Sequence, residues 1–311
     1  MDKDVPNTKV WVEFGQPGYE LLAVVSVIGA AWSFSRLSHQ VSLLESERLP
    51  VLAAAVALVF GGWGQLWHAL VETQWATALA QWRGWQRELP LARWPYLEPG
   101  TPGAALHRTL SQARAWWQDV GHKSLELPLR SALLALTVTL LLSLVLGRIA
   151  IVCSLLFCAW AELAALWHEG QGHVSALWIG WARVGLPWLL GAMLVLEAAA
   201  GAPAVVGVPA VGGVGTTAPE AKLATAMLSA LVLTLLFALY LQPSVMALLG
   251  PIVAAIYLIL QGRAFIAGVV LLLAFPGLRL ILHQPSEDAY RRAVIPWLLI
   301  MLIIIAGSLY L

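Results

Sequence analysis

The sequence predicts an all-α protein that crosses a membrane several times, as a single membrane domain over residues 1–311. Hydrophobic residues make up 60% of the chain and charged residues only 11%, whereas about 25% of the residues of soluble domains are charged. The apolar residues also gather in nine long stretches, and a helix needs about 20 mostly apolar residues to cross a bilayer. The net charge of +1 does not favour a nucleic acid as a partner.

Nine spanning helices are therefore expected. The breaks between neighbouring stretches are short and contain glycine or polar residues, as at Gly147-Arg148 and at Gln261-Gly262-Arg263. Residues 201–219, which are rich in Gly, Ala, Val and Pro, are expected to form a loop or a re-entrant segment. The predicted spans are residues 19–34, 50–70, 131–147, 149–167, 177–200, 221–241, 245–260, 264–281 and 294–311.

The lysine and arginine residues outside the spans indicate how the chain is oriented. Most of them fall on the side that carries the N-terminus, chiefly in the long segment 71–130 between the second and third spans. Cytoplasmic loops carry an excess of lysine and arginine, so the N-terminus and this segment are expected in the cytoplasm. With nine spans, the C-terminus is expected on the opposite side of the membrane.

Segment 71–130 is rich in tryptophan and contains two amphipathic stretches. Half of the chain's 16 tryptophans lie between residues 63 and 117. Helical spacing relates the members of each apolar set, which are Trp75, Leu79, Trp82 and Trp85 in the first stretch and Leu106, Leu110, Ala113 and Trp117 in the second. Such helices suit the membrane interface. They are expected either to seal the cytoplasmic face or to form a lid over a cavity or a docking surface.

Ionisable residues inside the predicted spans are costly in lipid, so each one is a candidate for a role. Glu162 lies near the cytoplasmic end of the fourth span, and Arg183 lies at a similar depth in the fifth. Because a short loop joins these two spans, a structural ion pair between Glu162 and Arg183 is expected.

His68 and Glu72 end the second span. They are four residues apart, so they share one face of the helix. Gly61, Gly62 and Gly64 precede them, and small residues allow another helix to approach closely. Two interpretations stay open: a polar pair at the interface beside a tight helix crossing, or a ligand or metal site at the mouth of a cavity.

Several local stretches have counterparts in one known family. Residues 61–68 form a glycine-containing run into a polar motif, residues 122–130 form a basic stretch with a proline before the third span, and residues 180–191 include Arg183, Gly185 and Pro187. Residues 286–292 precede the last span. With nine spans and a long cytoplasmic segment after the second, the chain resembles the UbiA superfamily of intramembrane prenyltransferases.

The resemblance implies a helical bundle of the UbiA type with a cavity for an isoprenoid tail. That family has two aspartate-rich motifs, after spans two and six, which hold magnesium ions on a prenyl diphosphate. Here Gly64, His68 and Glu72 stand at the spacing of the first motif, and residues 240–245 in the second place contain no acid. By resemblance, His68 and Glu72 are the expected magnesium ligands, and Arg83, Arg87 and Lys123 the expected diphosphate-binding residues.

The missing acids predict that the standard catalysis is lost or altered. The chain is then expected to handle an isoprenoid or another membrane lipid by its tail. Two alternatives stay open: a working magnesium-dependent prenyltransferase with divergent ligands, or a non-enzymatic subunit that binds other membrane subunits in a larger complex.

Overall fold

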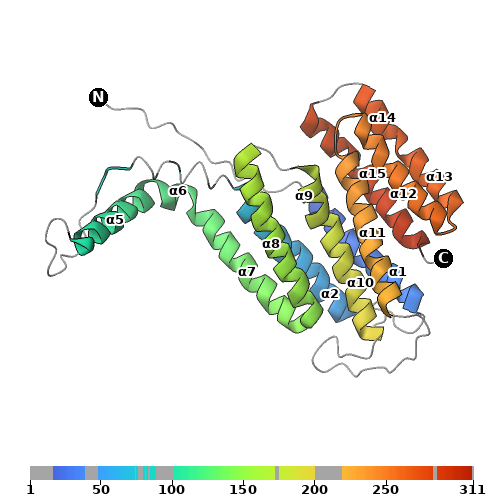
Figure 1. Cartoon of the computed structure of the whole chain (residues 1–311), viewed down its shortest axis with the longest axis horizontal. Coiled ribbons are helices and arrows are strands. Elements are labelled where there is room, and N and C mark those ends of the chain that lie inside the picture. The colour runs from blue at the N-terminus through green and yellow to red at the C-terminus, as the bar shows by residue number, and fades with distance from the viewer. Residues whose placement is uncertain are drawn as a thin grey trace.

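The structure is a computed structural model, which describes residues 17–38, 48–73, 75, 80, 82, 85–88, 101–171, 175–199, 219–282 and 286–309. Within these residues 91% are helical and no strand is present, so the all-α prediction is confirmed. The helices pack side by side in a bundle, and α5 (Pro102–Trp116) extends away from it at one end (Figure 1).

The first half of the bundle contains α1 (Pro17–Ser38), a long composite helix over residues 49–72, α7 (Glu126–Leu146) and α8 (Arg148–Gln171). Gly147 ends α7 with a φ of 96°, a conformation that favours glycine, and this produces the turn into α8. The composite helix alternates α and π turns: α2 (Leu49–Ala57), η1 (Leu58–Trp63), α3 (Gly64–Trp67) and η2 (His68–Glu72).

The second half begins with another composite helix, made of α9 (Ala176–Gly180), the π turn η4 (Trp181–Gly185) and α10 (Leu186–Ala199). The remaining elements are α11 (Pro219–Tyr240), η5 (Val245–Leu248), α12 (Leu249–Leu260), α13 (Ala264–Leu273), α14 (Phe275–Leu282) and α15 (Glu287–Ser308). Between α5 and α7 lie η3 (Trp117–Gly121) and α6 (His122–Ser124).

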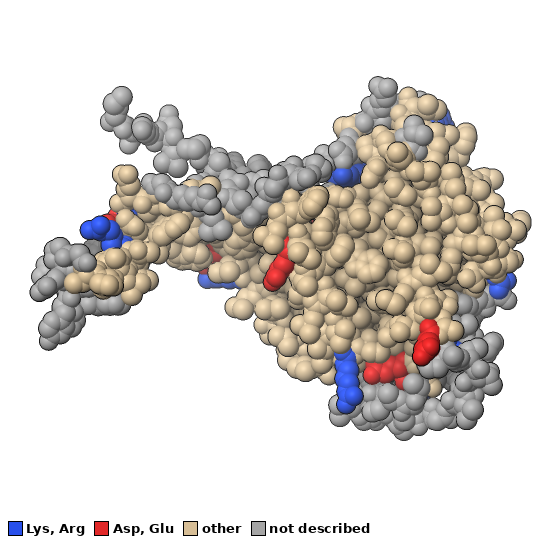
Figure 2. Space-filling view, viewed as in Figure 1, with Lys and Arg blue, Asp and Glu red and all other residues tan. Residues whose placement is uncertain are grey.

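Seven described helices are long and apolar enough to cross a membrane, by length and composition, which is compatible with a multi-pass membrane protein. They correspond to seven of the nine predicted spans. The other two predicted spans correspond to shorter apolar helices, Tyr19–Ser35 and Met246–Leu260. The exposed leucines of α7, such as Leu133 and Leu141, fit a helix that faces lipid. Most of the bundle surface in Figure 2 is free of charged side chains.

Small residues bring α1 close to α10 and α15. A β-carbon added at Gly191 of α10 would lie 2.5 Å from the carbonyl oxygen of Val27, and one added at Gly29 would lie 2.8 Å from Cβ of Ala306. The Ser33 hydroxyl donates a hydrogen bond of 2.6 Å to the carbonyl oxygen of Ala306. Close backbone contact and interhelical hydrogen bonds are the usual means of helix association in lipid, and here they place α1 inside the bundle.

Polar groups on aromatic side chains form hydrogen bonds between other pairs of helices. The ring of Trp63 stacks on Phe157 at 4.9 Å between centroids, and its indole N–H donates to the Ser154 hydroxyl at 3.0 Å. At the other end of the sequence, the Tyr290 hydroxyl donates to the carbonyl oxygen of Tyr240 at 3.0 Å. Each of these groups is buried and finds a partner, as buried polar groups must in an apolar surrounding.

Candidate functional site

Four ionisable side chains from three helices meet near one end of the bundle. We call Glu20, His68, Glu72 and Arg183 the charged cluster. Glu20 lies in the first turn of α1, His68 and Glu72 begin and end the π turn η2, and Arg183 lies in the π turn η4. Single π turns inside α-helices are rare and are frequent at functional sites. Two of the three helices that form the charged cluster have one at this point.

The imidazole ring of His68 is the centre of the charged cluster. Its Nδ1 atom contacts the Glu72 carboxylate. Its Nε2 atom lies 3.2 Å from Oε1 of Glu20 and 3.4 Å from Nη2 of Arg183. The side chains of His68 and Glu20 are 12% and 13% exposed, and Arg183 is 3% exposed. Gly64 makes room, since a β-carbon there would lie 3.3 Å from Nη1 of Arg183.

Arg183 is a buried cation whose neutralising charges are Glu72 and Glu20. A buried charge is tolerated only when opposite charges and hydrogen bonds compensate for the loss of water. The Nε atom of Arg183 is buried and has no hydrogen-bond partner. The guanidinium group therefore has one N–H donor that makes no hydrogen bond, although two carboxylates are near.

The ion pair expected between Glu162 and Arg183 is not formed between these two described residues. Glu162 is exposed on α8, whereas Arg183 is buried among residues of α1 and η2. The prediction was based only on the similar depth of the two residues in the membrane, on spans that follow each other in the chain. The actual partners of Arg183 lie on helices that are distant in the sequence. Depth alone does not identify such partners.

The implied magnesium ion fits the charged cluster poorly. His68 and Glu72 do lie together, as expected, but Glu72 contacts Nδ1 of His68. The Arg183 guanidinium lies 3.4 Å from the other ring nitrogen of His68, Nε2. Magnesium prefers an octahedral set of oxygen ligands, and a fixed cation beside the site opposes a second one. No group of three or more His, Cys, Asp or Glu side chains suited to a metal ion is found in the described part of the chain.

Of the expected diphosphate-binding residues, the two that the structure describes, Arg87 and Lys123, do not join the charged cluster. Arg83 lies outside the described residues. Arg87 forms an ion pair of 2.6 Å with Asp119 of η3, and Lys123 is exposed on α6. Arg87 therefore contributes to the attachment of η3 to the segment before α5.

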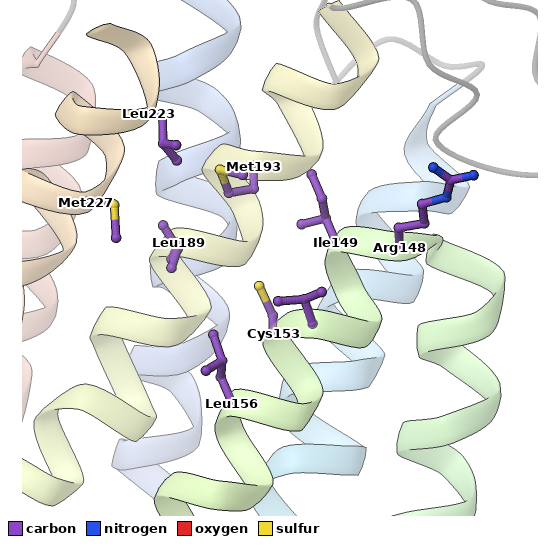
Figure 3. A pocket seen from close by; sticks show the side chains of 9 residues that line it. Arg148, Ile149, Cys153, Leu156, Leu189, Met193, Leu223 and Met227 are labelled. Carbon is purple, nitrogen blue, oxygen red and sulfur yellow. The ribbon is translucent and has the colours of Figure 1, made fainter. Parts of the chain in front are cut away.

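A second candidate site is an apolar groove between α8, α10 and α11, with a volume of about 200 Å³. Figure 3 shows side chains of the three helices around it. Leu156 and Met227 are 51% and 56% exposed, so the groove opens sideways toward the surface that faces lipid. Its lining residues are Arg148, Ile149, Val152, Cys153, Leu156, Leu189, Met193, Leu223 and Met227.

The surface of the groove is entirely apolar. Arg148, the first residue of α8, is the single charged lining residue, and its side chain extends away from the apolar ones (Figure 3). It interacts electrostatically with Glu197 of α10, whose Oε2 atom is buried without a hydrogen-bond partner. Sequence reasoning did not find this groove, because its residues are ordinary apolar residues of three separate helices.

The apolar stripe of α5 points away from the protein. Leu106, Leu110 and Trp117 are 52%, 41% and 37% exposed, whereas Ser111 and Ala115 are buried. Trp116 and Leu125 form a small apolar cluster with Trp75, Trp82 and Trp85. Leu79, the remaining member of the first predicted apolar set, lies outside the described residues. Within the described part of the chain, α5 thus packs by a mixed face and its apolar stripe is not covered.

Comparison of the chain with protein-family models, with curated proteins and with solved structures gives no match. Function must therefore be argued from the charged cluster, the apolar groove and the uncovered stripe of α5.

Proposed function

We propose that this multi-pass membrane protein binds the apolar tail of one lipid, of the isoprenoid class, in the groove between α8, α10 and α11. The observation that carries the proposal is the lining of the groove. Eight apolar side chains surround about 200 Å³, and a single arginine stands at one end. Ligand sites are mostly apolar concavities with a few placed polar groups, and this arrangement suits a tail with a polar head.

The hydrophobic effect cannot hold a tail in this groove, because bilayer lipid is as apolar as leucine. Retention has to come from the shape of the groove and from the head group. The branched leucine side chains, together with Met193 and Met227, offer an uneven wall. Such a wall suits a chain with methyl branches better than a straight acyl chain, and methionine adapts to irregular gaps.

The head group expected at Arg148 is small and neutral or zwitterionic. Arg148 interacts electrostatically with Glu197, so a head group at Arg148 is exposed to the field of one cation and one carboxylate. A diphosphate carries several negative charges and would be repelled by Glu197. This arrangement favours an alcohol, a quinone-type ring or a zwitterion over a prenyl diphosphate.

The proposal includes a bundle of the UbiA type with nine spans and a cytoplasmic N-terminus, in which the family's magnesium chemistry is lost or altered. Support comes from the charged cluster, where Glu72 contacts His68 and the Arg183 guanidinium lies 3.4 Å from the other nitrogen of the ring. None of these observations favours a working magnesium-dependent prenyltransferase, and that alternative becomes an outcome of the test.

The test is the thermal stability of the purified protein with added ligands. A ligand that binds only the folded state raises the apparent stability by mass action, by about 2.7 kcal/mol at 100 times its Kd. A long-chain prenyl alcohol is expected to stabilise the protein without magnesium and more strongly than a straight-chain alcohol of equal length. A rise seen only with the prenyl diphosphate and magnesium would contradict this proposal and favour the enzyme.

A matched pair of variants tests the groove itself. Leu156 lines the groove, and the adjacent Leu155 is 65% exposed and does not line it. Leu156→Trp fills the groove and is expected to lower the affinity for the prenyl alcohol at least tenfold. Leu155→Trp adds the same volume on the same helix and should leave the affinity unchanged. Equal effects of the two variants would place the ligand elsewhere.

A further inference from the structure

Glu162 is an exposed acidic residue inside a candidate membrane span. The span Arg148–His168 has Cys158 at its middle, so Glu162 lies four residues past the middle and six residues before the end. At 1.5 Å per residue, these six residues place Glu162 about 9 Å from the end of the span. Lysine and arginine reach the membrane interface along their long stems, whereas the glutamate side chain is too short for this distance.

The exposed neighbours of Glu162 on α8 are apolar. Leu155, Leu163 and Leu166 are 65%, 53% and 67% exposed. Ala159 and Leu166 lie one turn before and one turn after Glu162, on the same face of the helix. Within the described part of the chain, Glu162 has no hydrogen bond and no ion pair. Because ionisable residues in spans are costly in lipid and are almost always paired, the compensating partner has to come from outside this part of the chain.

We propose that this face of α8 binds a transmembrane helix of a partner protein, and that the partner helix carries a lysine or an arginine at the depth of Glu162. An ion pair compensates the cost of both charges, which accounts for an acid on an apolar face. The small side chain of Ala159 lets the partner helix approach closely, and the leucines around it supply apolar packing. The amine groups of lipids lie outside the hydrocarbon core and therefore not at this depth.

A second copy of this chain is a poor source of the cation. Among the lysines and arginines of the described spans, Arg183 is 3% exposed and belongs to the charged cluster. All the others are among the first or last five residues of a span. Arg130, the one that lies furthest from a span end, is paired with Glu126. The partner is therefore a different protein.

The contact goes beyond lipid binding and does not depend on it. The face and the groove share α8, but Leu155, Ala159 and Glu162 do not line the groove. A loss of helix binding can therefore be told apart from a loss of binding of the prenyl alcohol.

The experiment measures how a synthetic helix binds the purified protein in vesicles of phosphatidylcholine, which has no net charge. The probe is a leucine–alanine helix of about 20 residues with an acceptor dye at one end and one arginine at the depth of Glu162. The donor dye is attached at Lys123→Cys, in a variant without Cys153 and Cys158. Energy transfer should show that the arginine helix binds about tenfold more tightly than the same helix with leucine in place of the arginine.

Variants of Glu162 assign the preference to this residue. Glu162→Leu should bind the two helices equally, and Glu162→Lys should instead prefer a helix that carries glutamate in place of the arginine. Glu220 is the matched control, because it is also an exposed acid but lies in the first turn of α11, at the end of a span. Glu220→Leu should keep the full preference for the arginine helix.

The proposal is overturned if the protein with Glu162 intact binds both helices equally, or if Glu162→Leu keeps the preference. It is also overturned if donor-labelled and acceptor-labelled copies of the protein associate and Glu162→Leu abolishes this association, since the face would then bind a second copy. If Glu162→Leu fails to fold, Glu162→Gln takes its place, because glutamine keeps the shape of the side chain and lacks the charge.

Discussion

Gly191 is a residue at which α10 approaches α1 closely. A β-carbon there would lie 2.5 Å from the carbonyl oxygen of Val27 and 3.1 Å from Cβ of Ala30. The first neighbour is backbone, which cannot move aside without shifting a whole helix. Gly191→Ala is therefore expected to lower the free energy of unfolding by about 1–3 kcal/mol, as overpacking does. Thermal unfolding followed by circular dichroism measures the change.

Gly268 of α13 is the control for this substitution. It is exposed, and an added β-carbon there meets nothing within 4 Å. Gly268→Ala should be neutral or slightly stabilising, because alanine favours helix over glycine by up to about 1 kcal/mol. If Gly191→Ala were as well tolerated as Gly268→Ala, the close contact of α1 and α10 would not be present in the protein.

The candidate residues could be predicted from the sequence better than their partners could. Ionisable residues in apolar stretches, such as His68 and Arg183, stand out by composition alone. Glu20, which contacts His68, was not singled out, because it lies in the first turn of a span where an acid has an ordinary explanation at a helix N-terminus. Only the packing of α1 against the two π turns reveals its role.

At the level of elements, α5 exposes apolar residues within the described part of the chain. Its stripe of Leu106, Leu110 and Trp117 is exposed, and Arg114 and Lys123 nearby are exposed as well. Apolar residues flanked by cations suit the interface of an anionic leaflet. The stripe is therefore expected to lie against lipid head groups and the upper part of the acyl chains.

Nitroxide labels test this orientation in a variant that lacks Cys153 and Cys158, the two cysteines of the chain. A label at Leu110→Cys, on the stripe, should collide mainly with oxygen, which concentrates in lipid. A label at Gln118→Cys, which is exposed on a different face, should collide mainly with a water-soluble relaxation agent. Two labels that are both accessible from water would show that α5 stands clear of the membrane.

The positions of the helices were predictable, because a run of apolar residues is a strong signal even when its neighbours are unknown. Each predicted span corresponds to a helix in the structure. The π turns were not predicted, since one extra residue in a turn leaves the composition of the run unchanged. The direction in which the α5 stripe points could not be predicted either. The spacing of apolar residues shows that a helix has an apolar face, but it does not show what that face contacts.

At the scale of the whole molecule, the number of crossings is decided by the short helices. The twelve residues of α12 (Leu249–Leu260) span about 18 Å at 1.5 Å per residue, less than the roughly 30 Å of a hydrocarbon core. With η5 before it and the turn at Gln261 after it, the segment is expected to complete the crossing. If the other short apolar helix, Tyr19–Ser35, crosses as well, nine spans and opposite sides for the two termini are predicted.

Cysteine labelling from each side of the membrane tests this prediction, again in the variant without Cys153 and Cys158. Gln261→Cys should react only with reagent added on the side opposite the N-terminus. Lys123→Cys, on α6, should react only from the other side. Reaction of both residues from one side would mean that α12 enters the membrane and returns, and would reduce the number of crossings.

The π turns change which residues share one face of a spanning helix. A π turn holds one residue more than an α turn, so every residue after it is displaced by about 100° around the axis from the place that an unbroken α-helix would give it. Through η4, the face of α10 that carries Leu189 and Met193 is set out of step with the face of α9. Deletion of a single residue in η4 would turn the groove wall on α10 by about 100° around the helix axis and move Gly191 out of its contact with α1. The residues on the two sides of η4 therefore follow two different helical phases. The extra residue of the π turn separates the phase of the charged cluster from the phase of the groove.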